Sequence, residues 1–478
     1  MNFRTKQFLR KRFGEYYQTS GLILPPDFTR REWGFIFFDE LPNVVMRRHK
    51  SFSVEGEALE YIRMMAPAHV YHSAAYYQFP GAGTMKEKLW QGADLIFDLD
   101  ADHLPMKARS YAEMLSNVKS EAVKLLDFLL EDFGFSENNI SIVFSGGRGY
   151  HIHVRDPRVM MLEGAERREI VDYVGGTGLT VEFLFKKYGI GESHEIDLGK
   201  GTVYSQKIKV NEDIKRITSF EDISGGYGWG KRVSQYIVHY LKELSTKEES
   251  DIINETIDLL KTYNIKKTED YRIDDEVDTK KILQIKIEHT GWSLKKIADK
   301  SHAPEWIVRK ILIENDLWDF KKEAAKKVRI IMDIAKNPRK LEMIENKGIV
   351  DSSGIPELFS AVTQKAMDEN SIHLGGAKTD EPVTADTKRL IRMPSSLHGG
   401  SGMRVVPLTS TEFKKFEPLN DAVVFNEREI KIEVIPPLKP QNSLIEIKGK
   451  RFRVEEGINT LPEYAAIYLM CRGAAEYA

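Results

Sequence analysis

Three aspartates alternate with apolar residues over residues 95–102, and this pattern constrains both the local fold and its chemistry. Because side chains alternate along a strand, Asp98, Asp100 and Asp102 are expected on one face and the apolar residues on the other. Side chains two positions apart lie about 6.5–7 Å from each other, so two of these carboxylates can converge on divalent cations. Such a site suits phosphoryl or nucleotidyl transfer. An isolated Asp-x-Asp pair is about as often a solvated strand end as a metal site. Other motifs in the chain are therefore needed to distinguish the two.

Composition is that of an ordinary globular protein. The 478 residues are enough for two or three cores, and 41% hydrophobic with 30% charged residues is typical of this class. The formal charge of −2 gives no sign of a nucleic-acid binder. The single cysteine, Cys471, excludes an intramolecular disulfide and any zinc site built on several cysteines. We find neither a secretory signal at the start nor a run of about 18 apolar residues, and therefore expect a cytoplasmic protein without membrane contact.

Alternation of strand and helix predicts an α/β core that contains the acidic strand. Over residues 110–132, apolar side chains recur at helical spacing, and Gly134 follows where a C-cap glycine belongs. A second strand is expected over residues 140–144. This order of strand, helix and strand is typical of mixed folds.

The middle of the chain has a different character. Long, charged stretches with helical periodicity dominate residues 205–370, and strand patterns return only after them. We therefore predict an α/β (α+β) catalytic core formed by residues 1–204 and 371–478, interrupted by a mainly α-helical subdomain over 205–370. Within this subdomain, residues 292–298 and 306–312 have the outline of a helix-turn-helix, although two packed amphipathic helices would show the same pattern.

A glycine-rich turn follows the second predicted strand. Residues 145–149 read Ser-Gly-Gly-Arg-Gly, in which the glycines permit close backbone approach while Ser145 and Arg148 can bind phosphate oxygens. On the strand that follows, His151 and His153 share one face and are expected to face the same site as the aspartates. We interpret this segment as a triphosphate cradle, although a glycine turn between two strands is also common for structural reasons alone.

A third segment, residues 380–402, contains a carboxylate, then cations, then a histidine in a glycine-rich loop. Asp380, facing the first two aspartates, would complete a metal site. Arg392 and His398 could neutralise the charge of a triphosphate leaving group. All three segments thus point to the chemistry of a nucleoside triphosphate.

Together the three segments resemble the small catalytic subunit of archaeal and eukaryotic DNA primases, most closely the archaeal form. The resemblance rests on the metal strand within residues 92–103, the Ser-Gly-Gly-Arg-Gly-Tyr-His run at 145–151, and the segment from Asp-Glu-Pro-Val-Thr to Ser-Leu-His at 380–398. The order of the segments also matches, and the likeness covers roughly residues 1–200 and 375–478. It implies a primase-type core and a template-directed polymerase that starts chains without a primer.

By position, the resemblance implies two groups of site residues. Two magnesium or manganese ions would be held by Asp98, Asp100 and Asp380. The incoming nucleotide would be contacted by Arg48, Ser145, Arg148, His151, Arg392 and His398. Asp102 would be an outer or solvent-facing carboxylate. One metal ion would activate the 3′-hydroxyl and the other would steady the leaving pyrophosphate.

The same resemblance implies the substrates and the partner. Single-stranded DNA would be the template, NTPs or dNTPs the monomers, and a separate large primase subunit would complete a heterodimer. The activity would be the synthesis of short primers for DNA replication. The preferred sugar and the docking surface of the large subunit do not follow from the sequence.

Two features depart from the family pattern. Members commonly have a zinc-binding insertion rich in Cys and His between the first two motifs, whereas residues 103–144 contain no cysteine and only His103. We therefore expect no zinc knuckle. A lysine often stands two positions after the loop histidine, and here that position is Gly400. We expect either that Arg404 supplies the corresponding phosphate contact or that the contact is missing.

Three other functions stay open at this level. A haloacid-dehalogenase-like phosphatase also uses Asp-x-Asp, with Asp98 as the nucleophile, but it would have Thr or Val in place of Asp102 and no use for the turn at 145–151. A primase-like polymerase of end joining or lesion bypass would share the catalytic residues. A degraded primase-like subunit serving as a scaffold would be expected to have lost some of them.

Overall fold

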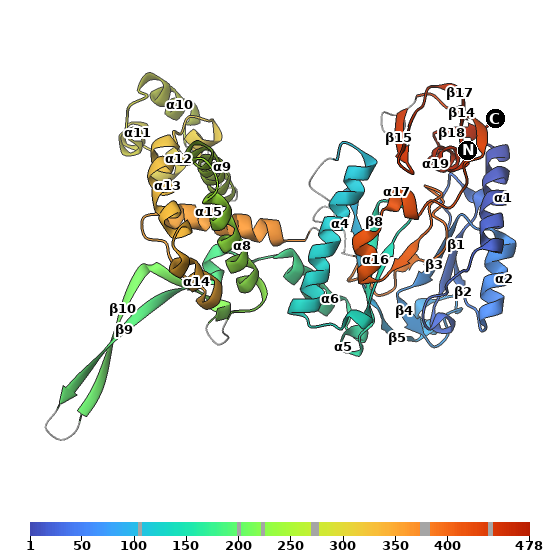
Figure 1. Ribbon diagram of the computed structural model, residues 1–478, viewed down its shortest axis with the longest axis horizontal. Helices are drawn as coiled ribbons and strands as arrows, with labels where there is room; N and C mark the ends of the chain where they lie inside the picture. Colours follow the sequence, from blue (N-terminus) through green and yellow to red (C-terminus); the bar gives the residue numbers. More distant parts are fainter. Residues whose placement is uncertain (104–107, 198–201, 221–224, 269–276, 373–382, 438–442) are drawn as a thin grey trace. The chain divides into compact units, whose positions relative to one another are not determined.

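The structure is a computed structural model that describes residues 1–103, 108–197, 202–220, 225–268, 277–372, 383–437 and 443–478 (Figure 1). Contacts divide the chain into two units, Met1–Thr177 with Ile372–Ala478, and Gly178–Ser371. The second unit thus begins at Gly178, whereas the sequence placed the start of the helical part at residue 205. Helices and antiparallel sheets occur together in the first unit, which confirms the α+β fold class.

The first large sheet of the first unit has the strand order β12-β3-β1-β2, and all its neighbours are antiparallel. Its strands are β1 (Trp33–Ile36), β2 (Arg47–Lys50), β3 (His69–Ser73) and β12 (Leu390–Arg392). All of β1 is buried, as expected for a short apolar run. Helices α1 (Phe3–Thr19) and α2 (Glu55–Met65) pack against each other beside this sheet (Figure 1). Because β12 belongs to the third sequence motif, the sheet ties that motif to the first part of the chain.

The second large sheet has the order β13-β7-β8-β6 and is also antiparallel. Its strands are β6 (Leu95–Asp100), β7 (Ile140–Phe144), β8 (Gly149–Val154) and β13 (Val406–Leu408). Along β6 the apolar side chains Leu95, Phe97 and Leu99 are buried, whereas Asp98 and Asp100 are partly exposed. The predicted alternation of this strand is therefore confirmed as far as Asp100.

Helix α4 (Tyr111–Asp127) covers β8 and β6. It begins at Ser110, whose hydroxyl accepts a hydrogen bond from the Glu113 N–H at 3.1 Å. Its apolar stripe, which includes Leu115, Val118 and Leu125, is buried against the sheet. A π-helical turn (Phe128–Asp132) follows, and Gly134 then adopts a φ of +61°, as the sequence predicted for a glycine after the helix.

Three small sheets, one of them the antiparallel pair β4–β5, and a buried helix complete the described part of the first unit. One sheet pairs β17 (Gly457–Pro462), β14 (Glu429–Val434) and β18 (Ala475–Tyr477), and β15 (Leu444–Ile447) pairs with β16 (Lys450–Arg453). Helix α19 (Glu463–Cys471) is buried along almost its whole length, which matches its apolar sequence. Shorter elements of the unit are α3 (Met85–Lys88), β4 (Ala75–Tyr77), β5 (Trp90–Ala93), α5 (Pro157–Met160), α6 (Gly164–Gly175), α16 (Ser410–Lys415) and α17 (Pro418–Asp421).

The second unit is mainly helical, as predicted. Its helices are α7 (Val181–Leu184), α8 (Gly228–Leu244), α9 (Glu249–Thr268), α10 (Thr279–Glu288), α11 (Leu294–Ser301), α12 (Glu305–Glu314), α13 (Lys321–Ala335), α14 (Pro338–Lys347) and α15 (Pro356–Asn370). A long antiparallel pair, β9 (Phe185–Asp197) and β10 (Thr202–Ile217), is joined by β11 (Ile349–Asp351). The two long strands are a feature that the helical periodicity did not predict.

Helices α10, α11 and α12 share one apolar cluster built on Ile282, Ile297, Val308 and Ile311. Most of α12 is buried, including the aliphatic residues at 307, 308 and 311–313. A helix-turn-helix also packs its helices around a shared apolar core. The helix-turn-helix over 292–312 therefore stays a prediction, with two packed amphipathic helices as its alternative.

A charged cluster links four helices of the second unit around Glu357 on α15. The Glu357 carboxylate accepts hydrogen bonds from Lys327 Nζ (2.8 Å), Arg309 Nη2 (2.8 Å) and Asn264 Nδ2 (2.9 Å). These donors come from α13, α12 and α9. Partly buried ion pairs of this kind hold helices in register because each donor loses a partner if one helix moves.

None of the helices in the described part of the chain is both long enough and apolar enough to span a membrane.

Candidate active site

The pairing of β6 with β8 brings the first two sequence motifs together. In the ladder between them, Asp98 lies opposite His151 and Asp100 lies opposite Gly149. A Cβ atom on Gly149 would stand 1.9 Å from the carbonyl oxygen of Leu99. Glycine is therefore required for this close approach of the two strands.

His151 is buried beside Asp98, with 3.5 Å between its Nε2 atom and Asp98 Oδ1. Burial lowers the pKa of His151 to about 4; the Asp98 carboxylate opposes this shift and the Arg392 charge adds to it. The imidazole is thus neutral at neutral pH. His153, which the sequence also placed on this face, is fully buried and lies opposite Ile96, deeper in the fold.

Arg148 joins the two remaining carboxylates of the motif. Its Nη2 lies 2.6 Å from Asp102 Oδ2, and its Nε lies 3.6 Å from Asp100 Oδ1. Asp102 itself belongs to a 3-10 turn (Ala101–His103), and its N–H donates to Asp100 Oδ1 at 3.1 Å. The expectation that Asp102 continues the strand was therefore wrong, because the chain turns after Asp100.

The glycine turn and the third motif meet at His398. Gly146 has a φ of +75°, and a Cβ atom on it would stand 2.7 Å from His398 Cβ. A Cβ atom on Gly147 would stand 3.1 Å from His398 Nε2. Two of the glycines that the sequence suggested for phosphate approach thus also make room for the histidine loop.

His398 is oriented by its own loop. Its Nδ1 accepts a hydrogen bond from the Gly400 N–H at 3.2 Å and lies 3.3 Å from Ser401 Oγ. This arrangement assigns the proton of the neutral ring to Nε2, which can then donate. Desolvation lowers the pKa of His398 well below its usual value, and the Arg392 charge lowers it further.

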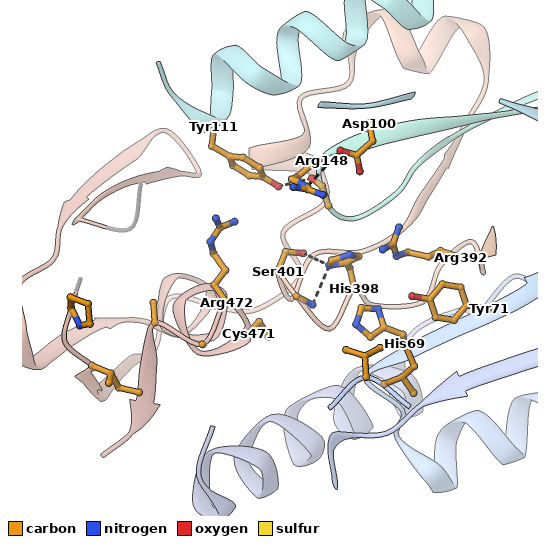
Figure 2. Close-up of a pocket in the computed structure, with 18 of the residues that line it drawn as sticks. His69, Tyr71, Asp100, Tyr111, Arg148, Arg392, His398, Ser401, Cys471 and Arg472 are labelled. Carbon is orange, nitrogen blue, oxygen red and sulfur yellow. Dashed lines mark hydrogen bonds and ion pairs between the residues drawn. The ribbon is translucent and has the colours of Figure 1, made fainter. Parts of the chain in front are cut away.

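The end of β6, the glycine turn and the His398 loop border one cavity of about 700 Å³ (Figure 2). Four residues predicted from the sequence line it: Asp100, Arg148, Arg392 and His398. Asp98, Ser145 and His151 are not among its lining residues, although the strand ladder and the glycine turn place them next to those that are. The cavity thus combines carboxylate, guanidinium and imidazole groups within reach of one nucleotide.

The cavity has further lining residues that the sequence reasoning missed, including His69, Tyr71, Tyr111, Ser401 and Arg472 (Figure 2). Burial lowers the pKa of His69 to about 3, and the Arg392 charge lowers it further. His69 and Tyr71 alternate along β3, so a period-two pattern over residues 69–73 was a signal that could have found them. Tyr111 and Arg472 have no such local signal.

Two arginines proposed for nucleotide contact lie elsewhere. Arg48 is held by the buried Glu32 carboxylate, with Nε–Oε1 and Nη2–Oε2 distances of 3.1 and 3.2 Å, and is not among the residues that line the cavity. Arg404 interacts with the Tyr16 hydroxyl of α1 and also does not line it. The structure therefore does not bring Arg404 to the position that Gly400 leaves without a cation. Asp380 lies outside the described residues.

Two aspartates stand at an antiparallel sheet edge, beside a cavity lined by arginine and histidine. This is the arrangement of a nucleotidyl-transfer enzyme.

Comparisons with known proteins agree with this class of enzyme. The family model described as DNA primase small subunit matches residues 97–286. The chain is 42% identical to "DNA primase small subunit PriS" of Methanocella arvoryzae over the whole of both chains. It is 43% identical to that of Methanosarcina acetivorans, covering 100% of this chain and 98% of the relative, and 36% identical to that of Halobacterium salinarum, covering all of both.

The chain belongs to the DNA primase small subunit family. The resemblance to archaeal DNA primase small subunits that was seen in the sequence is therefore confirmed. The chain is an enzyme of the DNA-directed nucleotidyltransferase class. Membership in this family excludes the phosphatase hypothesis.

Proposed function

We propose that this chain synthesises short primers de novo on single-stranded DNA for replication, using two divalent cations. In each step the 3′-oxygen of one nucleotide bonds to the α-phosphorus of the next, the bond between the α- and β-phosphates breaks, and pyrophosphate leaves. The observation that carries the proposal is the β6–β8 ladder, which places Asp98 and Asp100 beside the Arg148 turn and the cavity. Carboxylates and triphosphate ligands are thus adjacent, as an in-line displacement requires.

Asp98 and Asp100 fit a site for magnesium or manganese. Both carboxylates are partly exposed at the end of one strand face, and hard oxygen donors are the ligands these ions prefer. Among the described residues, no three or more His, Cys, Asp or Glu side chains are grouped so that they could hold a metal ion. We propose Asp380 as the third ligand. When bound, the cations would activate the 3′-hydroxyl and offset the charge of the leaving pyrophosphate.

We assign the triphosphate to Ser145, Arg148, His151, Arg392 and His398. The two arginines supply positive charge, and the Nε2–H of His398 can donate to a phosphate oxygen. Arg148 would exchange its contacts with Asp102 for phosphate oxygens, which are also anionic. Arg48 stays a prediction, because nucleotide contact would require it to leave Glu32.

The partners follow from the family. The relatives are named small subunits, and on this basis we propose a large primase subunit as the heterodimer partner. Single-stranded DNA and NTPs or dNTPs are the proposed substrates, and the cytoplasm is the proposed location of replication. A primase-like polymerase that only extends primers is the second candidate, because it would use the same site.

The test is synthesis on unprimed single-stranded DNA with labelled NTPs and, separately, dNTPs, in Mg²⁺ and in Mn²⁺, with and without a large subunit. We expect short products that Asp98→Ala abolishes and that Asp27→Ala, at an exposed aspartate far from the site in the sequence, leaves unchanged. Products only from annealed primers would favour the primed polymerase. No product from either substrate in any of these mixtures would overturn the proposed function.

A further inference from the structure

A cavity of about 280 Å³ lies in the second unit, between α14 and the part of the β9–β10 pair next to β11 (Figure 1). We call it the α14 cavity. Most of its lining is apolar and includes Ile214 of β10 and Met343 of α14. Tyr188 of β9 adds an aromatic ring, and Arg339 and Lys340 of α14 add two cations. All of these residues belong to the second unit, and none of them lines the active-site cavity.

A row of exposed cations leads along α13 to this cavity. We call it the cation row, and it consists of Lys326, Arg329, Lys336 and Arg339. Steps of three and seven residues place Lys326, Arg329 and Lys336 on one face of the helix, over about 15 Å of its length. Asp333 lies on the same face, and Lys340 Nζ donates to its Oδ2 at 2.7 Å. The first turn of α14, with Arg339, therefore lies beside this face.

The side chains of the cation row have no hydrogen bond or ion pair with any residue that the structure describes. Elsewhere in the unit, Lys247 is paired with Glu243 and Lys266 with Asp368. Neighbouring cations without partners repel one another, and a polyanion relieves this repulsion. A solvated helix face carries the same charges, so the neighbouring cavity has to distinguish the two readings.

Tyr188 gives the α14 cavity a surface on which a flat ring can stack. The tyrosine is half-buried, and the guanidinium carbon of Arg216 lies 4.5 Å from the centre of its ring. Arg216 Nε is buried and has no hydrogen-bond partner within the described part of the chain. Asp351, which also lines the cavity, accepts hydrogen bonds from the N–H and the hydroxyl of Ser353 at 3.0 and 2.5 Å. Aromatic rings and arginines beside a basic surface are the groups on which unpaired bases stack.

The size of the α14 cavity limits its occupant. Its volume of about 280 Å³ lies just below the range of about 300–1,000 Å³ found for small-molecule pockets, which suits one base better than a whole nucleotide. Bases of a duplex are paired and stacked inside the helix and cannot enter such a cavity, whereas those of a single strand can. The size therefore favours a single strand over a duplex.

We propose that the second unit has its own binding site for single-stranded DNA. One base enters the α14 cavity and stacks on Tyr188, and the phosphates beside that base contact the cation row. Arg339 belongs to both parts, because it lines the cavity and ends the row. This inference goes beyond the proposed function, which concerns the active site of the first unit.

The experiment measures the binding of a labelled oligo(dT) strand to the full chain by fluorescence anisotropy, without nucleotides, over a range of salt concentrations. Lys326→Ala combined with Lys336→Ala is expected to raise the Kd about tenfold. The slope of log K against log salt concentration should fall by about 1.4, because each phosphate contact of a single strand contributes about 0.7. Tyr188→Leu is expected to raise the Kd at least about fivefold without changing the slope, because it removes stacking and no charge.

Matched variants separate these contacts from general effects. Lys261→Ala combined with Lys266→Ala removes the same charge from exposed lysines of α9, which are paired with Asp316 and Asp368. Its Kd should change less than about twofold. Tyr188→Phe keeps the ring and should bind like the wild type. Tyr188→Leu should not weaken the binding of a duplex, and thermal unfolding checks that each variant is folded.

The site is overturned if neither the double lysine variant nor Tyr188→Leu weakens binding, or if the α9 control lowers the salt slope equally. Equal weakening by Tyr188→Phe and Tyr188→Leu would remove the base from the α14 cavity. Loss of large-subunit binding from the double variant at unchanged DNA affinity would make the cation row a protein interface instead. Primer synthesis by the wild type is measured in parallel, and its absence would refute the proposed function while leaving the DNA-binding result intact.

Discussion

The imidazole of His151 lies 3.5 Å from the Asp98 carboxylate, directly across the ladder between β6 and β8. Burial lowers the pKa of His151 to about 4 even though the carboxylate opposes that shift. His151 is therefore a neutral imidazole at neutral pH and stands beside Asp98 as an uncharged hydrogen-bonding group.

Asp98→Ala and Asp100→Ala are expected to reduce nucleotide incorporation to below about 1% of wild type, because each removes a proposed metal ligand. Both side chains are partly exposed at a strand end, so the free energy of unfolding should change by less than about 1 kcal/mol. Steady-state incorporation and thermal unfolding together check this. Incorporation near the wild-type rate in either variant would remove that aspartate from the metal site.

Arg148→Ala is expected to raise the KM for the incoming nucleotide by about 10–100-fold and to lower kcat, because a charge-assisted contact to the triphosphate is lost. Asp102→Asn is the informative companion, since it breaks the ion pair with Arg148 but leaves the arginine in place. Its KM should be no higher than that of the wild type. Equal damage from both substitutions would mean that the ion pair positions the loop and that Arg148 does not bind phosphate.

Local periodicity accounts for what could be predicted of the site. The period of two along β6 and β8 placed Asp98 and His151 on the same side of the sheet, and the structure puts them opposite each other. The glycines at 146 and 147 marked a close approach, and His398 fills it. Spacing within each strand or turn thus determines which face a side chain takes, whereas the pairing of β6 with β8 and the approach of the His398 loop join segments far apart in the chain.

Contacts between distant segments could not be predicted in this way. Arg48 was expected to contact the nucleotide, but it is bound by the buried Glu32, which directly precedes the neighbouring strand β1. Tyr111 and Arg472 reach the cavity because α4 and the end of α19 pack around it, and neither residue stands in a recognisable pattern. The long β9–β10 pair was missed because the helical periodicity that dominates residues 205–370 was taken to begin at residue 205, although residues 206–210 alternate between polar and apolar side chains.

Gly149→Ala is expected to destabilise the first unit by about 2–4 kcal/mol. The new methyl group would stand 1.9 Å from the Leu99 carbonyl oxygen, so β6 and β8 would have to separate. Gly56→Ala is the matched control, because Gly56 lies in α2 and a Cβ atom there would meet nothing within 4 Å. The control should be neutral or stabilising by up to about 1 kcal/mol, since alanine favours the helix. Thermal unfolding of both variants measures the difference, and equal melting temperatures would contradict the strand contact.

Glu357→Gln is expected to destabilise the second unit by about 1–2 kcal/mol at neutral pH, once solvent screening is allowed for. Burial alone would raise the pKa of Glu357, but hydrogen bonds, that from Lys327 foremost, and the Arg309 charge lower it to about 2. A lowered folded-state pKa contributes stability that is complete above the unfolded value of about 4.5 and is lost as the pH falls toward 2. The difference in melting temperature between wild type and Glu357→Gln should therefore be largest above pH 4.5 and should shrink as the pH falls below that value. Glu342→Gln, at an exposed glutamate of α14, should show no such pH-dependent difference. A melting-temperature difference between wild type and Glu357→Gln that stayed constant from pH 7 to pH 2 would mean that the charge of Glu357 does not stabilise the helices around it.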